Sequence, residues 1–138
     1  MMSIFQRWLR PLGSIAFAIL ATASANAADP IAQYHWKNRV LVILGPRAGD
    51  EAFETQKSAY ERARNEYNER DLVVLTEPEY DGPLHRRFHI PGGEFRVLLI
   101  GKDGHTALER SKPVSNQDLF GLIDAMPMRR QEMRSKGS

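Results

Sequence analysis

The stretch from Phe95 to Arg134 constrains the fold more than any other part of the chain. It opens with an apolar run, Phe95 to Ile100, and a second, alternating run follows from Thr106 to Arg110. The Asp103-Gly104 pair between them favours a two-residue hairpin turn, because both residue types accept the positive φ angles that such turns need. Ser115 precedes an apolar stripe at helical spacing and can cap that helix. The stretch therefore predicts strand, turn, strand and helix.

The preceding part of the chain predicts a second unit. Residues 39–44 form a continuous apolar run that ends at Gly45-Pro46, which is typical of a strand covered on both faces. Asp50 can cap the next segment, whose apolar residues recur at helical spacing as far as Tyr67. Another apolar run occupies residues 71–76. A strand, a helix and a strand with short links indicate a right-handed parallel βαβ unit.

Together these units predict an α/β fold of order β-α-β-loop-β-β-α, with a mixed four-stranded sheet and helices on both faces in three layers. The loop, residues 77–94, is interrupted by prolines and glycines, so only a turn or two of helix fits between Leu84 and His89. A link of this length is often functional. After Pro127 a basic, helical tail is expected to Arg134, and residues 135–138 are expected to be disordered.

The first 27 residues have the three parts of a secretory signal peptide. Arg7 and Arg10 precede an apolar run, and small residues follow it up to Ala27. The alternative is an uncleaved membrane anchor, but the run is shorter than a spanning helix needs and is interrupted by polar residues. We therefore expect cleavage after Ala27, a folded domain over residues 28–134, and a periplasmic or secreted protein with no transmembrane segment after cleavage.

Composition excludes several classes of function. The chain has 19 basic and 17 acidic residues, and two of the basic ones lie in the expected signal peptide, so the mature protein has no net charge. Global charge therefore does not favour a nucleic-acid partner. The chain also contains no cysteine. Because a thiolate is the nucleophile in thiol–disulfide exchange, neither thiol–disulfide oxidoreductase nor cysteine-peroxidase chemistry is possible. No cofactor is predicted.

The order of elements and the Gly-Lys-Asp-Gly turn resemble the thioredoxin fold. The sequence more specifically resembles a bacterial domain-of-unknown-function family related to the DUDES domains of animal extracellular proteins with sushi repeats. The residues behind this resemblance are 36–46, 69–74, 95–104 and 113–134. It implies a thioredoxin-like fold with no established reaction. Alignment on the thioredoxin strand places Gly49 and Ala52 at the two thiol positions and Arg96 near the cis-proline position.

A candidate anion site comes from Arg47, Asp50, Arg86 and Arg87. If residues 77–94 fold back over residues 45–50, the guanidinium groups meet the N-terminus of the first helix, where backbone N–H groups favour a carboxylate or phosphate. Ligands of α/β sheets gather beyond the carboxyl ends of parallel strands, which is where this edge would lie. The alternative is ordinary ion pairing of the arginines with Glu77, Glu79 and Asp81.

His85 and His89 are a weaker candidate, for a metal ion. Four residues apart on a helical turn, they would share a face, and Asp81 or Glu79 offers a third ligand. Arg86 and Arg87 lie between them and repel a cation, so a polar surface turn is the favoured interpretation.

Two functional hypotheses follow. The first is a non-catalytic binding module whose partner is an unknown protein or a small anionic ligand. The second is an enzyme of unrecognised chemistry that uses Arg47, Asp50, His85, Arg86 or His89. A catalytic site would bring two or three of these side chains within hydrogen-bond reach of one another in a water-poor cleft.

Overall fold

The computed structural model describes residues 28–138, so the predicted signal peptide lies outside the described residues. Four strands form one sheet of order β2-β1-β3-β4. These strands are β1 (Arg39–Leu44), β2 (Leu72–Glu77), β3 (Arg96–Ile100) and β4 (Thr106–Arg110). β1 runs parallel to β2 and antiparallel to β3, and β3 runs antiparallel to β4. The mixed four-stranded sheet that the sequence predicts is therefore confirmed.

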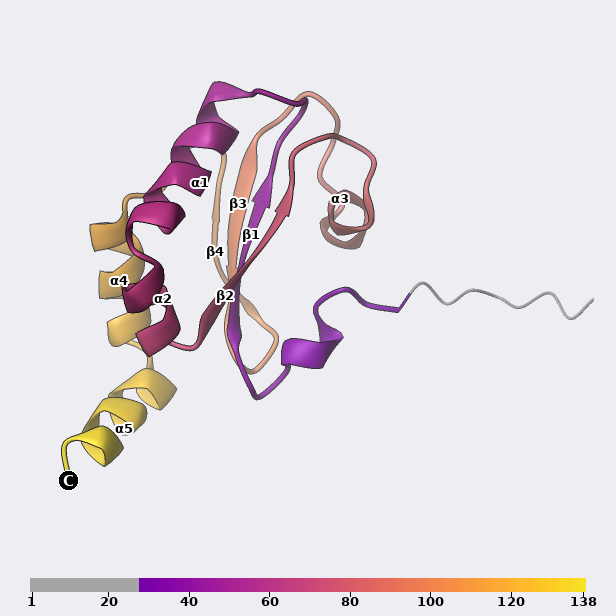
Figure 1. Ribbon diagram of the computed structural model, residues 1–138. Helices are drawn as coiled ribbons and strands as arrows, with labels where there is room; N and C mark the ends of the chain where they lie inside the picture. The colour runs from indigo at the N-terminus through magenta and orange to yellow at the C-terminus, as the bar shows by residue number, and fades with distance from the viewer. Residues whose placement is uncertain (1–27) are drawn as a thin grey trace, which may run out of the picture.

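Helical segments cover both faces of this sheet, as the three-layer prediction requires (Figure 1). On one face lie α1 (Glu51–Arg62), α2 (Arg64–Glu69) and α4 (Asn116–Asp124). The other face carries only the 3-10 helix η1 (Ala32–Tyr34) and α3 (Pro83–Phe88). The chain ends in α5 (Pro127–Lys136). Within residues 28–138, no helix has the length and apolar character needed to cross a membrane.

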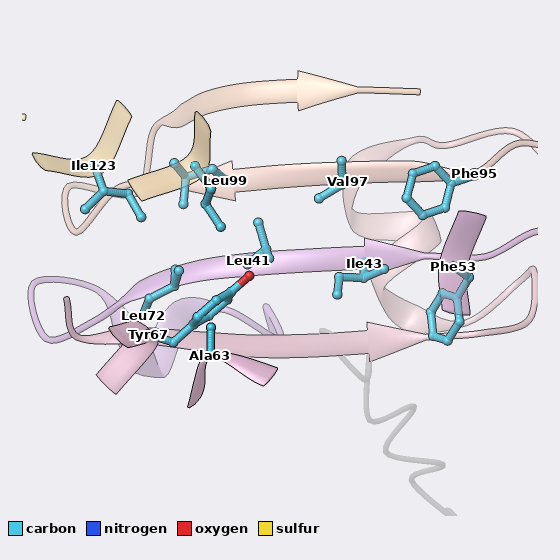
Figure 2. Packing of buried hydrophobic residues seen from close by; sticks show 11 residues of the cluster. Leu41, Ile43, Phe53, Ala63, Tyr67, Leu72, Phe95, Val97, Leu99 and Ile123 are labelled. Atoms are coloured by element: carbon cyan, nitrogen blue, oxygen red, sulfur yellow. The ribbon is translucent and has the colours of Figure 1, made fainter. Parts of the chain in front are cut away.

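The face under α1, α2 and α4 holds the larger core. Leu41 and Ile43 of β1 point to this side, where they meet Leu99 of β3 and the fully buried Tyr67 of α2. Figure 2 shows Phe53 and Phe95 at one end of this core and Tyr67, Leu72 and Ile123 at the other. Strand residues alternate between faces, so the unbroken apolar run of β1 supplies both cores.

The face under η1 and α3 has a thinner cover. Val40, Val42 and Leu44 of β1 point to it. They pack against a few apolar residues in or next to the short helical segments: Ile31, Leu84 and Ile90. Each of the two helical segments is short, at three and six residues. Because side chains of β1 alternate between the two faces, its apolar residues on this face must also be buried. The least regular parts of the chain bury them.

Both predicted helix caps are present. The Asp50 carboxylate accepts a hydrogen bond from Phe53 N at 3.1 Å, and the Ser115 hydroxyl accepts one from Asp118 N at 3.1 Å. These bonds satisfy backbone donors that have no partner inside the helix. The turn or two of helix expected between Leu84 and His89 is also present, as α3. The scaffold therefore follows local sequence signals closely.

Two local predictions need correction. The hairpin between β3 and β4 is not a two-residue turn, because Gly101 N donates to His105 O at 2.8 Å and encloses the three residues 102–104. Gly104 adopts φ +84°, which suits the last position of such a loop. The final helix also extends to Lys136, beyond the predicted limit at residue 134. There the Ser135 hydroxyl donates to Gln131 O at 3.0 Å.

Candidate functional site

The candidate site is built around α3, and a single carboxylate accepts hydrogen bonds from two backbone N–H groups of this helix. Glu77, the last residue of β2, accepts hydrogen bonds from Leu84 N at 2.9 Å and from His85 N at 3.0 Å. Pro83 occupies the first turn, where its missing N–H is of no consequence. The helix ends at His89, which adopts the left-handed conformation with φ +54°. The sheet therefore fixes the position of α3 through the Glu77 side chain.

Glu77 also bonds the buried ring of His85. Their Nδ1 and Oε1 atoms lie 2.5 Å apart, and His85 is only 2% exposed. Burial alone would raise the pKa of the Glu77 carboxyl, but the hydrogen bonds from His85 and Leu84 outweigh it and hold this pKa below its ordinary value. Glu77 is consequently a carboxylate near neutral pH, and His85 Nδ1 carries the proton between them.

The other ring nitrogen of His85 is unsatisfied. His85 Nε2 is buried and has no hydrogen-bond partner among the described residues. A buried polar atom without a partner costs about 1–3 kcal/mol, so such atoms are uncommon in folded proteins. Tyr80 packs edge-on against the imidazole, with ring centroids 5.5 Å apart. Because the Tyr80 side chain is half exposed, it separates His85 from solvent as a thin cover.

Gly82 allows the Glu77 carboxylate to reach α3. A Cβ atom built at Gly82 would lie 2.1 Å from the carboxyl carbon of Glu77 and 2.3 Å from its Oε1. Any larger residue would therefore displace the carboxylate from the backbone of α3. The sequence places this glycine directly before Pro83, and both residues serve the same helix start.

A cleft of about 470 Å³ opens beside this pair. Its walls come from the segment before α3, from α3 itself and from the segment after it: Tyr80, Asp81, His85, Arg86, His89, Ile90 and Pro91. Arg86 Nη1 donates to Asp81 O at 2.5 Å and lies 3.5 Å from Asp81 Oδ1. Within residues 28–138 its other guanidinium nitrogens make no hydrogen bond, and its side chain is 63% exposed. The cleft therefore offers free N–H donors from a cationic side chain.

The structure does not assemble the four predicted site residues. Asp50 is occupied as the cap of α1, and Arg47 is exposed on the loop before that helix. Arg86 lines the cleft, whereas Arg87 Nε donates to Asp29 Oδ2 at 2.9 Å and lines a different cleft. The reason is that Leu84 and Ile90 draw α3 onto the face opposite α1. The expected meeting of the arginines with the N-terminus of α1 is therefore absent.

The two histidines share the cleft but differ in environment. His85 is buried and His89 is exposed, although both line the same space. Across residues 28–138, no three His, Asp or Glu side chains lie close enough together to hold a metal ion. The pairing of His85 with Glu77 escaped sequence reasoning, because a bond between residues eight apart across a turn carries no periodic signal.

A second charged cluster, also missed from sequence, lies at the opposite end of β1. Arg39 is 1% exposed and donates from both terminal nitrogens to Glu132 of α5, each at 3.2 Å. Lys102 Nζ lies 2.6 Å from Glu132 Oε1 and 2.9 Å from Asp71 Oδ2. Burial raises the pKa of Glu132, but Arg39 and Lys102 outweigh it and lower the net value. We interpret this cluster as the anchor of α5.

The neighbouring pairs complete the anchor. Asp124 accepts from Arg70 Nη2 at 2.9 Å and from Arg129 Nε at 3.1 Å. Arg129 Nη1 also donates to Glu69 O at 2.9 Å, which ties α5 to the end of α2. Of the cluster's side-chain nitrogens, Arg39 Nε is buried without a partner, although both terminal nitrogens of Arg39 are bonded. A nearly saturated network of this kind leaves little capacity for a ligand.

Comparison with known proteins identifies the family. The model for "Domain of unknown function (DUF4174)" matches residues 30–132. The chain belongs to the DUF4174 family. Among solved structures it is similar to the reduced 2-Cys peroxiredoxin of Plasmodium vivax, at 15% identity and a TM-score of 0.56, covering 73% of this chain and 83% of that one. It is also similar to thioredoxin peroxidase I of Plasmodium yoelii, at 14% identity and a TM-score of 0.56, covering 78% and 81%.

These similarities concern the fold. At such identities they establish that this DUF4174 domain has the thioredoxin-like architecture of the peroxiredoxins. The chemistry named in those proteins does not follow, because this chain has no cysteine at any position. The scaffold of a thiol enzyme is present here without a thiol.

Proposed function

We propose that this DUF4174 domain is an exported, non-catalytic binding protein that holds a small anionic ligand in the cleft beside α3. Export rests on the signal-peptide pattern of residues 1–27 and places the protein in the periplasm or the medium. We also propose that this domain is related to the extracellular DUDES domains. One observation carries the binding role: Arg86 lines the cleft with free N–H donors, beside His85, whose Nε2 has no hydrogen-bond partner among the described residues.

The charge of the cleft supports an anion. Arg86 supplies a planar set of donors that fits a carboxylate or phosphate in a bidentate manner. His89 adds a second nitrogen-bearing ring at the same opening. The acid in the lining, Asp81, is already engaged through its backbone and side-chain oxygens by Arg86. A ligand carboxylate or phosphate would therefore compete for the guanidinium with only one exposed acid.

The arrangement of polar groups favours binding over catalysis. Arg47, Asp50, His85, Arg86 and His89 were the residues available to an enzyme, and in the described part of the chain no side-chain hydrogen bond joins any two of them. The Glu77–His85 pair resembles the way a carboxylate orients a catalytic base. However, none of the residues that line the cleft is a serine, threonine or cysteine that such a base could activate. The nucleophile that a triad of this kind activates is therefore missing from the cleft lining.

The test compares two adjacent arginines. Mature protein, residues 28–138, is titrated calorimetrically with inorganic phosphate and with acetate, and Arg86→Ala is compared with Arg87→Ala. We expect Arg86→Ala to weaken binding at least about tenfold, because it removes the free donors. Arg87→Ala is the matched control and should bind as the wild type does, since Arg87 faces another cleft. Equal losses in both variants, or no binding by the wild-type protein, would refute the proposal.

A further inference from the structure

A second, unrelated surface surrounds Trp36. This residue is 62% exposed, which makes it the most exposed large hydrophobic side chain of the described residues. Its backbone adopts φ +64°, a left-handed conformation that is an outlier for so bulky a residue. A 2.7 Å hydrogen bond from Trp36 N to Lys102 O fixes it there. Glycine or asparagine would suit this backbone better, so the indole ring occupies a position that local conformation disfavours.

The ring of Trp36 belongs to a fixed platform. His35 packs beside it, with ring centroids 4.8 Å apart at an interplanar angle of 32°. His35 Nε2 lies 3.1 Å from Asp103 O, and the ring also lies over Gly104, where an added Cβ would approach it to 3.5 Å. The β3–β4 loop therefore supports the platform from below. An aromatic surface held this way offers an apolar face with little conformational freedom left to lose on binding.

A hydrogen-bonding cleft adjoins this platform. It has a volume of about 240 Å³, and His35 and Gly104 form part of its wall. Its floor is apolar, with Val40 and Ile100 of the sheet, and its rim carries Asp29, Asn38 and Arg87. Asp29 and Arg87 pair with each other at 2.9 Å, so the rim has donors and acceptors but no net charge. Few polar groups over an apolar floor are typical of small-molecule sites.

We propose that Trp36 and this cleft bind a neutral oligosaccharide. The carbon–hydrogen face of a pyranose ring is flat and apolar and stacks on an indole, while its hydroxyl groups both donate and accept hydrogen bonds. The Trp36–His35 platform matches the first property, and the Asp29, Asn38 and Arg87 rim matches the second. An anionic membrane surface fits less well, because it calls for a cluster of unpaired basic residues and Arg87 is paired.

The sequence makes the test direct. Trp8 and Trp36 are the only tryptophans, so in protein that starts at residue 28 the indole fluorescence comes from Trp36 alone. Mature protein is titrated with chitotriose and cellotriose while Trp36 emission is followed, and affinities are measured by calorimetry. We expect a saturable change in emission with a Kd of about 1 mM or tighter. A parallel titration uses vesicles that contain anionic phospholipid.

Trp36→Asn separates binding from folding. Asparagine accepts a positive φ more readily than tryptophan, so thermal stability should be unchanged or higher while saccharide affinity falls by at least about tenfold. Tyr80→Ala removes the half-exposed aromatic ring of the α3 cleft and should leave saccharide binding intact. The proposal is overturned if wild-type protein shows no response to either saccharide, if Trp36→Asn still binds, or if only the vesicles change Trp36 emission.

Discussion

The two faces of the sheet are covered to different depths. α1, α2 and α4 cover the larger core, and side-chain bonds such as Tyr67 Oη to Asn116 Oδ1 at 2.8 Å link these helices to one another. The other face relies on η1 and α3, which two side-chain contacts help to hold in place: Glu77 with His85, and Asp29 with Arg87. Both proposed ligand clefts lie on this thinner side. One face therefore holds the larger core, and the other carries both proposed ligand clefts.

The largest expected effect comes from truncating one leucine on each face. Leu119 of α4 is fully buried, and Leu119→Ala should lower the free energy of unfolding by about 3–5 kcal/mol. Leu84 of α3 is 7% exposed, and Leu84→Ala should cost only about 2–3 kcal/mol, because a thin cover collapses more easily into the space. Chemical denaturation measures both. A larger loss of unfolding free energy for Leu84→Ala than for Leu119→Ala would contradict the difference between the two faces.

A smaller effect is expected at Gly82. The new Cβ of Gly82→Ala meets the Glu77 carboxylate and should displace it, which leaves donors of Leu84 and His85 unsatisfied and costs about 1–3 kcal/mol. Gly121→Ala in α4 is the control, since nothing lies within 4 Å of its Cβ, and it should gain about 0.5–1 kcal/mol. Hydrogen exchange of Gly82→Ala should quicken in α3 and remain slow in α1 and α4. Uniform acceleration would contradict a separate role for the two faces.

The smallest expected effect concerns pH. The pKa of Glu77 is lowered in the folded state, so its contribution to stability is present above its ordinary value of 4.5 and is lost as the pH falls through the folded value. Unfolding free energy should therefore decrease on acidification below about pH 4.5, and less steeply in Glu77→Gln. Part of the dependence of unfolding free energy on pH should remain in Glu77→Gln, because the pKa values of Asp124 and Glu132 are also lowered. Identical slopes in the two proteins would show that Glu77 does not stabilise α3 in this way.

The fold followed from local signals in the sequence. The unbroken apolar run of β1 predicts burial on both faces, and the caps Asp50 and Ser115 locate the starts of two helices. Even the short α3 could be predicted from the gap between Pro83 and Pro91. Each of these features depends on residues close together in the chain, which is why sequence patterns reveal them.

The site could be predicted only in part. Arg86 was a candidate and does line a cleft, but the grouping with Arg47, Asp50 and Arg87 depended on which face α3 covers. The packing of Leu84 and Ile90 against β1 determines which face α3 covers. A helix of six residues is too short for its periodicity to predict that face. The Glu77–His85 hydrogen bond and the Arg39–Glu132 contact form only when the chain folds. No residue spacing in the sequence predicts them.

The most direct test of the binding proposal is a nuclear magnetic resonance map of the anion site. Amide shifts of mature protein, residues 28–138, are followed during titration with inorganic phosphate at constant ionic strength. The account predicts shifts concentrated in residues 80–91, absent in Arg86→Ala and retained in Arg87→Ala. Shifts concentrated in residues 45–50 and at the start of α1, or in α4, would contradict it and would place ligand binding on the face assigned here to stability.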